Sequence, residues 1–222
     1  SMKAGFWHER WEANQLGFHQ AEVNDLLKTW WTRLRVPPAG AVFVPLCGKS
    51  LDMTWLRSEG HPVVGVEVSP IAVRDFFTEA QIEAVEERNS SFQVSTGDGY
   101  TLYCGDFFDL DSSHLAGVQG VYDRASLIAL PPEMRKRYAE HLCEILPQDV
   151  EILLVTIEYD PSKMSGPPHS VSRDEIDRYF DARFEIELMW SSGPQAPTPR
   201  FQERGLATWC ESVWRLSARA RA

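Results

Sequence analysis

Short runs of apolar residues alternate along this chain with longer stretches in which apolar residues recur every three or four positions. The runs predict β-strands, and the spacing of three and four predicts amphipathic helices. Strands are expected at residues 42–44, 63–66, 92–95, 100–104, 118–122, 152–157, 184–190 and 207–216. Helices are expected at residues 23–34, 50–60, 69–79, 131–146 and 173–180, and loops at 160–172 and 191–205. Strands alternating with helices predict an α/β fold with a mostly parallel sheet covered on both faces, to which the closing strand pair adds an antiparallel strand.

The most informative segment is the strand–turn–helix–strand unit at residues 42–67. Its first apolar run breaks at Pro45 and turns through Gly48, and its second run ends on a lone acid, Glu67, 19 residues past that glycine. In nucleoside-binding sheets such a glycine lets the backbone approach the ligand, and the acid accepts hydrogen bonds from ribose hydroxyls. The turn lacks the G-x-G-x-x-G pattern of dinucleotide folds. Because no phosphate then has to be cradled, the segment favours S-adenosylmethionine over NAD.

Polar residues also follow two later strands, at the sheet edge where ligands of such folds bind. Asp106-Phe107 follows the predicted hairpin, and Asp123-Arg124 follows the strand at 118–122. The acid and its apolar neighbour at 106–107 suit an adenine ring, and Arg124 suits the reaction cleft. Each has a simpler alternative: Glu67 as a solvated strand end, Asp106-Phe107 as a capped turn with a core aromatic, and Arg124 as a surface ion-pair residue.

Composition narrows the function further. With 222 residues and 43% hydrophobic content, the chain is expected to form one domain over residues 1–222. The formal net charge is −10 and no cluster of Lys and Arg is present, which disfavours nucleic acid as a partner. The four cysteines are widely spaced, as in reduced intracellular proteins. No apolar run approaches about 18 residues and no signal peptide is recognisable, so we expect a cytoplasmic protein without a membrane partner.

Several segments, in order along nearly the whole chain, resemble the thiopurine S-methyltransferase family in its short, bacterial form. They are Trp7-His-Glu-Arg-Trp11, Gly17-Phe-His19, Pro45-Leu-Cys-Gly-Lys-Ser-Leu-Asp-Met53, Gly65-Val-Glu67, Leu102-Tyr-Cys-Gly-Asp-Phe-Phe-Asp-Leu110, Tyr122-Asp-Arg-Ala-Ser-Leu-Ile-Ala129, and Tyr159-Asp-Pro161 with Gly166-Pro-Pro168. The resemblance implies a monomeric, S-adenosylmethionine-dependent methyltransferase of class I. It also implies a Rossmann-like, doubly wound sheet of seven strands with one antiparallel strand, and an N-terminal helical lid over residues 1–35.

The resemblance further assigns roles to matching positions. The cofactor-binding residues it implies are Trp11 in the lid, Leu46 in the first turn, Glu67 at the ribose, Asp106 and Phe107 at the adenine, and Arg124 at the methyl-transfer site. Phe18 is expected to line the substrate pocket, and Arg204 is expected to be a second catalytic arginine beside Arg124. No metal site is implied. The expected acceptor is a small aromatic or heterocyclic thiol, with selenium and tellurium compounds as further acceptors that the resemblance leaves open.

Methyl transfer from a sulfonium is an in-line displacement that needs alignment, exclusion of water and a thiolate. The two arginines would stabilise the anionic acceptor, and Cys47, with no His or Asp partner pattern around it, is not expected to be a nucleophile. Alternatives are a nicotinamide oxidoreductase, a nucleic-acid adenine methyltransferase, a methyltransferase of other acceptor specificity and a non-catalytic S-adenosylmethionine-binding module. The first lacks its glycine pattern here. The second lacks its N/D-P-P-Y motif, in whose place stands Asp123-Arg-Ala-Ser126.

Overall fold

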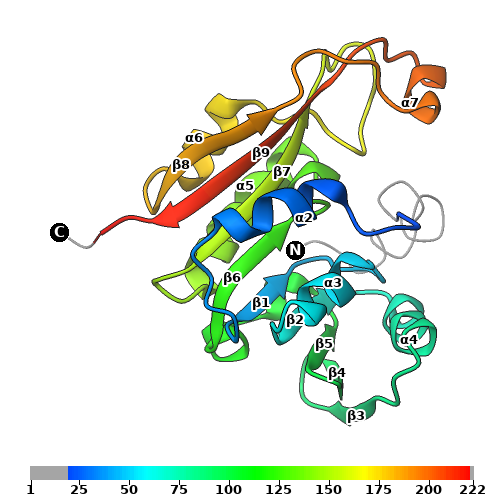
Figure 1. The fold of residues 1–222 in the computed structure, drawn as a ribbon, viewed down its shortest axis with the longest axis vertical. Helices are drawn as coiled ribbons and strands as arrows, with labels where there is room; N and C mark the ends of the chain where they lie inside the picture. Colours follow the sequence, from blue (N-terminus) through cyan, green and yellow to red (C-terminus); the bar gives the residue numbers. More distant parts are fainter. Residues whose placement is uncertain (1–19, 221–222) are drawn as a thin grey trace.

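A computed structural model describes residues 20–220, and its centre is a nine-stranded sheet with the strand order β3-β4-β5-β2-β1-β6-β7-β9-β8 (Figure 1). The strands are β1 Ala41–Val44, β2 Val63–Glu67, β3 Val85–Arg88, β4 Gln93–Gly97, β5 Tyr100–Cys104, β6 Val118–Asp123, β7 Glu151–Glu158, β8 Phe184–Ser191 and β9 Cys210–Ala218. Strands β5, β2, β1, β6 and β7 are parallel to one another, so their carboxyl ends meet at one edge of the sheet.

Helices cover both faces of this sheet. They are α2 Asp25–Trp30, α3 Asp52–Ser58, α4 Pro70–Glu79, α5 Pro132–Ile145, α6 Arg173–Phe180 and α7 Pro199–Glu203, with 3-10 turns η2 Trp31–Arg33, η3 Phe107–Asp109, η4 Ser112–Leu115 and η5 Leu127–Ala129. In Figure 1, α2 and α3 lie in front of the strands and α4 lies to their right, while α5 and α6 lie behind them. Among the described residues, no helix is long and apolar enough to cross a membrane.

The sheet divides the apolar interior into two cores because successive side chains of a strand point to opposite faces. Val42 and Val44 of β1 pack into the core beneath α2, α3 and α4, whereas Phe43 between them packs into the core beneath α5 and α6. Apolar side chains on both faces explain why the central strands read as continuous apolar runs. The predicted doubly wound α/β fold is confirmed.

The expected count of seven strands is wrong for the sheet as a whole. Seven strands, β5-β2-β1-β6-β7-β9-β8, form the expected arrangement with β9 as its one antiparallel member. Two more strands, β4 and β3, extend the sheet beyond β5, and β4 is a second antiparallel strand. The pattern predicted β4 as half of a hairpin but missed β3, whose four residues are all exposed and therefore show no apolar alternation.

Three smaller expectations are also corrected. The helix predicted at 23–34 is the single α-helical stretch α2 followed by η2, and the loop predicted at 191–205 contains α7. The last strand starts at Cys210 rather than at residue 207. The N-terminal lid, with Trp11 and Phe18, falls largely on residues 1–19, outside the described residues, so these assignments remain predictions.

Candidate active site

The turn after β1 brings backbone donors to the carboxyl edge of the sheet. Leu46 and Gly48 both have positive φ values, 47° and 54°. Glycine adopts this region without penalty, but a leucine there is strained, and such strain is found at ligand sites. The Cys47 N–H donates to the Val66 carbonyl at 3.0 Å, which holds the turn beside β2. The predicted glycine turn is therefore present and points its backbone toward the end of β2.

Glu67, the last residue of β2, is held at this turn by backbone groups. Its Oε1 accepts the Gly48 N–H at 3.2 Å and its Oε2 accepts the Ser69 N–H at 2.7 Å. The side chain is buried, and loss of solvent raises its pKa to about 7, although the N–H groups of Ser69 and Gly48 oppose that shift. Each carboxylate oxygen accepts more than one hydrogen bond. Both oxygens therefore retain capacity for hydroxyl donors such as those of a ribose.

The loop after β5 adjoins Glu67 through its backbone, since the Gly105 N–H donates to the Glu67 carbonyl at 2.9 Å. Asp106 caps η3 by accepting the Phe108 N–H at 2.9 Å, and partial burial raises the pKa of its carboxyl. The Phe107 ring is 2% exposed and packs 5.0 Å from Tyr138, between ring centroids. The alternative of a capped turn with a core aromatic thus describes these side chains, and their contact with an adenine remains a prediction.

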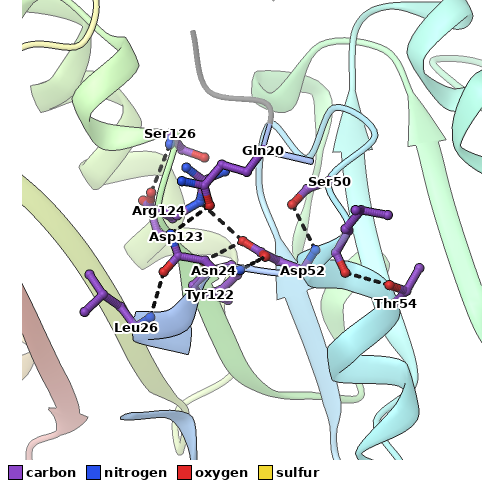
Figure 2. A network of polar contacts seen from close by, with 11 residues as sticks. Gln20, Asn24, Leu26, Ser50, Asp52, Thr54, Tyr122, Asp123, Arg124 and Ser126 are labelled. Atoms are coloured by element: carbon purple, nitrogen blue, oxygen red, sulfur yellow. Dashed lines mark hydrogen bonds and ion pairs between the residues drawn. The ribbon is translucent and has the colours of Figure 1, made fainter. Parts of the chain in front are cut away.

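Arg124 is paired with a buried carboxylate. Its Nε lies 3.3 Å from Oδ2 of Asp52, whose side chain is 2% exposed while that of Arg124 is 13% exposed. The same Oδ2 accepts the Tyr122 hydroxyl at 2.7 Å, and Oδ1 accepts the Asn24 N–H at 2.8 Å. Figure 2 shows Asp52 at the centre of these contacts. The arginine is therefore held by a network that joins α2, α3 and the loop after β6.

The residues next to Arg124 lock this loop in place. Asp123 is buried and accepts the N–H groups of Ser126 and Leu127 at 3.1 and 3.2 Å, and the Tyr138 hydroxyl at 2.6 Å. The Ser126 hydroxyl in turn donates to the Pro45 carbonyl at 2.6 Å. Asp123 is consequently a structural residue, and the loop that carries Arg124 is tied directly to the turn after β1.

Arg204 follows α7 and joins two loops. Its Nη1 donates to the Pro167 carbonyl at 3.0 Å, its Nη2 donates to the Ser165 carbonyl, and the guanidinium lies 6.0 Å from the centroid of the Phe201 ring. The residue is exposed. These bonds connect the loop after β7 with α7 and do not reach the pair of Arg124 and Asp52, so a catalytic role for Arg204 remains a prediction.

Two acidic residues of this edge escaped the sequence analysis. Asp52 stands between Leu51 and Met53 on the buried side of α3, and a charged residue on an apolar helix face was the available signal. Glu211 lies near the start of β9; partial burial raises the pKa of its carboxyl, and attraction to Arg124 opposes the shift. Nothing in the local pattern relates Glu211 to Arg124, because the two are far apart in the sequence.

Cys47 lies within the turn, and its thiol is expected to be unreactive. The side chain is buried, burial raises the pKa of its thiol well above the ordinary value, and the neighbouring Glu67 carboxylate raises it further. A thiol, unlike a thiolate, is a poor nucleophile. The four cysteines are free, without disulfides.

Comparison with known proteins identifies the relatives of this chain. A model of the thiopurine S-methyltransferase family matches residues 2–219. The thiopurine S-methyltransferase of Nitrosospira multiformis is 47% identical over 218 residues, which cover 98% of this chain and 99% of that protein. The one of Methylococcus capsulatus is 45% identical over the full length of both chains. The chain belongs to the thiopurine S-methyltransferase family.

Solved structures agree with this family at the level of the fold. An S-adenosylmethionine-dependent methyltransferase from Anabaena variabilis is 15% identical, superposes with a TM-score of 0.63, and the match covers 97% of this chain and 95% of that one. The 1,6-didemethyltoxoflavin-N1-methyltransferase of Burkholderia thailandensis, solved with S-adenosylhomocysteine, is 16% identical with a TM-score of 0.59, and the match covers 96% and 84% of the two chains. The predicted family, the methyltransferase class and S-adenosylmethionine as methyl donor are confirmed.

Proposed function

We propose that this thiopurine S-methyltransferase family member transfers the methyl group of S-adenosylmethionine to the sulfur of an aromatic or heterocyclic thiol, such as a thiopurine. The observation that carries the proposal is the buried Glu67 carboxylate, which two backbone N–H groups hold at the tip of β2 beside a positive-φ glycine turn. This arrangement fits a ribose, because a carboxylate with remaining lone pairs faces a turn that needs no phosphate contact.

S-adenosylmethionine supplies a methyl carbon activated by its sulfonium, so the chain need not supply a nucleophile of its own. What its residues contribute is binding and orientation at one edge of the sheet. Glu67 anchors the ribose, and Asp106 with the loop after β5 is proposed to receive the adenine. Leu46, in the turn after β1, would also contact the nucleoside.

On the acceptor side, Arg124 is proposed to orient the thiolate and to stabilise its negative charge. Its positive charge is already balanced by Asp52 at 3.3 Å. The pair is close to neutral overall, so the guanidinium acts more through directed N–H donors than through net charge. A heteroaromatic thiol is acidic enough to ionise without a dedicated base.

The proposal also covers the N-terminal segment, the domain organisation, the location and the oligomeric state of the protein. Residues 1–35 are proposed to cover the cofactor as a lid within a single domain of residues 1–222, with Trp11 against the cofactor and Phe18 in the acceptor pocket. We further propose a cytoplasmic monomer that acts on small molecules. Its net charge of −10 supports a small-molecule acceptor over nucleic acid.

The experiment is steady-state methylation of 6-mercaptopurine by the full chain with labelled S-adenosylmethionine, together with calorimetric titration of S-adenosylhomocysteine. We expect one cofactor site per chain and methyl transfer to sulfur. Binding without methylation of any thiol or selenol in a substrate screen would reduce the protein to a binding module. Methylation of nitrogen or oxygen in preference to sulfur would assign it a different acceptor.

A further inference from the structure

We propose that Asp52 is a positioning residue for the methyl-transfer reaction, whose carboxylate sets the orientation of the Arg124 guanidinium and links it to the start of α2. The inference rests on the proposed function, because it concerns how the acceptor side is organised. It adds a residue that acts through Arg124 and does not itself touch the acceptor.

The geometry places Asp52 where three elements meet. Its side chain is 2% exposed, and its two oxygens receive donors from the N-cap of α2, the end of strand β6 and the loop after β6. Oδ1 accepts the Asn24 N–H at 2.8 Å, and Oδ2 accepts the Tyr122 hydroxyl at 2.7 Å and Arg124 Nε at 3.3 Å. The main chain at Asp52 is held as well, since the Asp52 N–H donates to the Ser50 hydroxyl at 3.1 Å.

The charge balance explains why such a residue sits inside a helix face that is otherwise apolar. A buried carboxylate is stable only with a partner, and Arg124 supplies the opposite charge. Because the contact uses Nε, it fixes the plane of the guanidinium, whose five N–H donors then point in defined directions. Asp52 therefore determines where the donors of Arg124 are directed, which an arginine on a flexible stem does not determine alone.

Asp52 also connects the arginine to α2. The Asn24 that donates to Oδ1 caps α2, because its side chain accepts the Leu26 N–H at 2.9 Å. The Gln20 side chain, at the beginning of the described residues, accepts a hydrogen bond from Asn24 Nδ2 at 2.9 Å. One carboxylate thus holds both Arg124 and the segment that leads into α2.

Asp52→Asn is the decisive variant because it keeps the shape of the side chain. The amide oxygen still accepts the Asn24 N–H, whereas the amide nitrogen faces the donors Tyr122 and Arg124. A hydroxyl rotates to accept a hydrogen bond, but a guanidinium has only donors. The substitution therefore breaks the contact with Arg124 in particular. Tyr122→Phe is the matched control, since it removes the other donor to the same Oδ2 and leaves the ion pair in place.

For Asp52→Asn we expect kcat for 6-mercaptopurine to fall at least about tenfold, while Kd for S-adenosylhomocysteine changes less than about twofold. Tyr122→Phe should lower the melting temperature to a similar extent and keep kcat within about threefold. Asp52→Glu, which retains the charge and moves it by one methylene, should keep more turnover than Asp52→Asn. Should Asp52→Asn fail to fold, Asp52→Glu still decides, because positioning predicts a lower kcat at unchanged cofactor affinity.

A double-mutant cycle tests whether Asp52 acts through Arg124. In an Arg124→Ala background, Asp52→Asn should cause no further loss of kcat. Equal, independent losses in both backgrounds would overturn the proposal, as would parallel losses of kcat in Asp52→Asn and Tyr122→Phe.

A readout without turnover separates this inference from the proposed function. Exchange of the Arg124 Nε–H with solvent, followed by NMR and assigned with Arg124→Lys, should quicken at least about tenfold in Asp52→Asn and remain slow in Tyr122→Phe. If the wild-type chain methylates no thiol, the proposed function fails while slow exchange still supports the Asp52 anchor. If exchange is equally fast in the wild type and in Asp52→Asn, the anchor is wrong even in an active enzyme.

Discussion

The proposed cofactor half and the proposed acceptor half of the candidate active site hold their charged side chains in different ways. On the cofactor side, at the ends of β1, β2 and β5, Glu67 is fixed by the backbone N–H groups of Gly48 and Ser69. On the acceptor side, beyond β6 and β7, Arg124 is fixed by the side chain of Asp52 and Arg204 by carbonyls of a loop. The position of Glu67 thus depends on the path of the main chain, whereas that of Arg124 depends on the side chain of Asp52.

This difference affects how the cofactor contacts and the acceptor contacts respond to substitutions nearby. A carboxylate held by main-chain donors keeps its position through most substitutions nearby, as long as the turn and the strand remain. An arginine held by another side chain moves when that partner changes, and loops tolerate such changes. We therefore expect the contacts proposed for the methyl donor to tolerate nearby substitutions better than those proposed for the acceptor.

The largest effect should come from Arg124, the residue proposed to orient the acceptor. Arg124→Ala should lower kcat for 6-mercaptopurine about 100-fold, because the directed N–H donors proposed to stabilise the thiolate are lost. Arg124→Lys should retain part of the activity, since it keeps the charge and loses the planar fork. The measurement is steady-state methylation, with affinity for S-adenosylhomocysteine determined separately.

Stability has to be measured in the same variants. Arg124→Ala leaves Asp52 buried without its cation, and removing one partner of such a pair costs about 3–5 kcal/mol. Thermal unfolding must therefore show that the variant is folded at the assay temperature. Wild-type turnover in a folded Arg124→Ala protein would make the arginine purely structural and would remove the contrast between the two halves.

Glu67 should give the next largest effect, and on binding rather than turnover. Hydrogen bonds to a charged group contribute about 1.5–3 kcal/mol each, so Glu67→Ala should weaken S-adenosylhomocysteine binding tenfold or more. The Gly48 and Ser69 N–H groups lose their acceptor in this variant, and thermal unfolding should report a moderate loss of stability. Calorimetric titration gives the affinity, and an unchanged Kd would remove Glu67 from the cofactor site.

The contrast between the halves could be anticipated from the sequence only on one side. The turn at Gly48 and the acid at Glu67 belong to a single local unit, so their spacing predicted their proximity, which the bond between the Gly48 N–H and Glu67 Oε1 confirms. The role of Glu67 at a ribose stays a prediction. Asp52 in α3 and Arg124 in the loop after β6 are 72 positions apart in the sequence, and no local pattern encodes their contact. The exposed strand β3 was missed for a related reason, because only its pairing with β4 marks it as a strand.

The pH dependence of cofactor binding tests whether the Glu67 carboxylate binds the cofactor. Burial raises the pKa of Glu67 from 4.5 to about 7 in the free protein. Folding therefore favours the protonated carboxyl of Glu67. The contribution of this group to the free energy of unfolding is complete below pH 4.5 and is lost as the pH rises through about 7. Ribose hydroxyls favour the carboxylate, so affinity for S-adenosylhomocysteine should fall about tenfold between pH 8 and pH 6, with proton release on binding.

Titration in two buffers of different ionisation enthalpy measures that proton release directly. Glu67→Ala should abolish both the pH dependence and the released proton. Proton release that persists in Glu67→Ala would assign the linkage to another group of the cofactor half, for which Asp106, whose pKa is also raised by burial, is the first candidate.

The smallest effect is expected at Arg204. Its guanidinium connects the carbonyls of Ser165 and Pro167 to α7, and it is exposed, so Arg204→Ala should leave the fold and the cofactor affinity unchanged. Because Arg124 remains, we expect KM for the thiol to rise only about threefold, with kcat nearly constant. Arg204→Lys is the matched control, since one ammonium replaces the two Nη groups that bridge the loops. If Arg204→Ala instead lowers kcat as strongly as Arg124→Ala does, the loops around α7 close over the acceptor during the reaction, and the acceptor half depends on two arginines of equal weight.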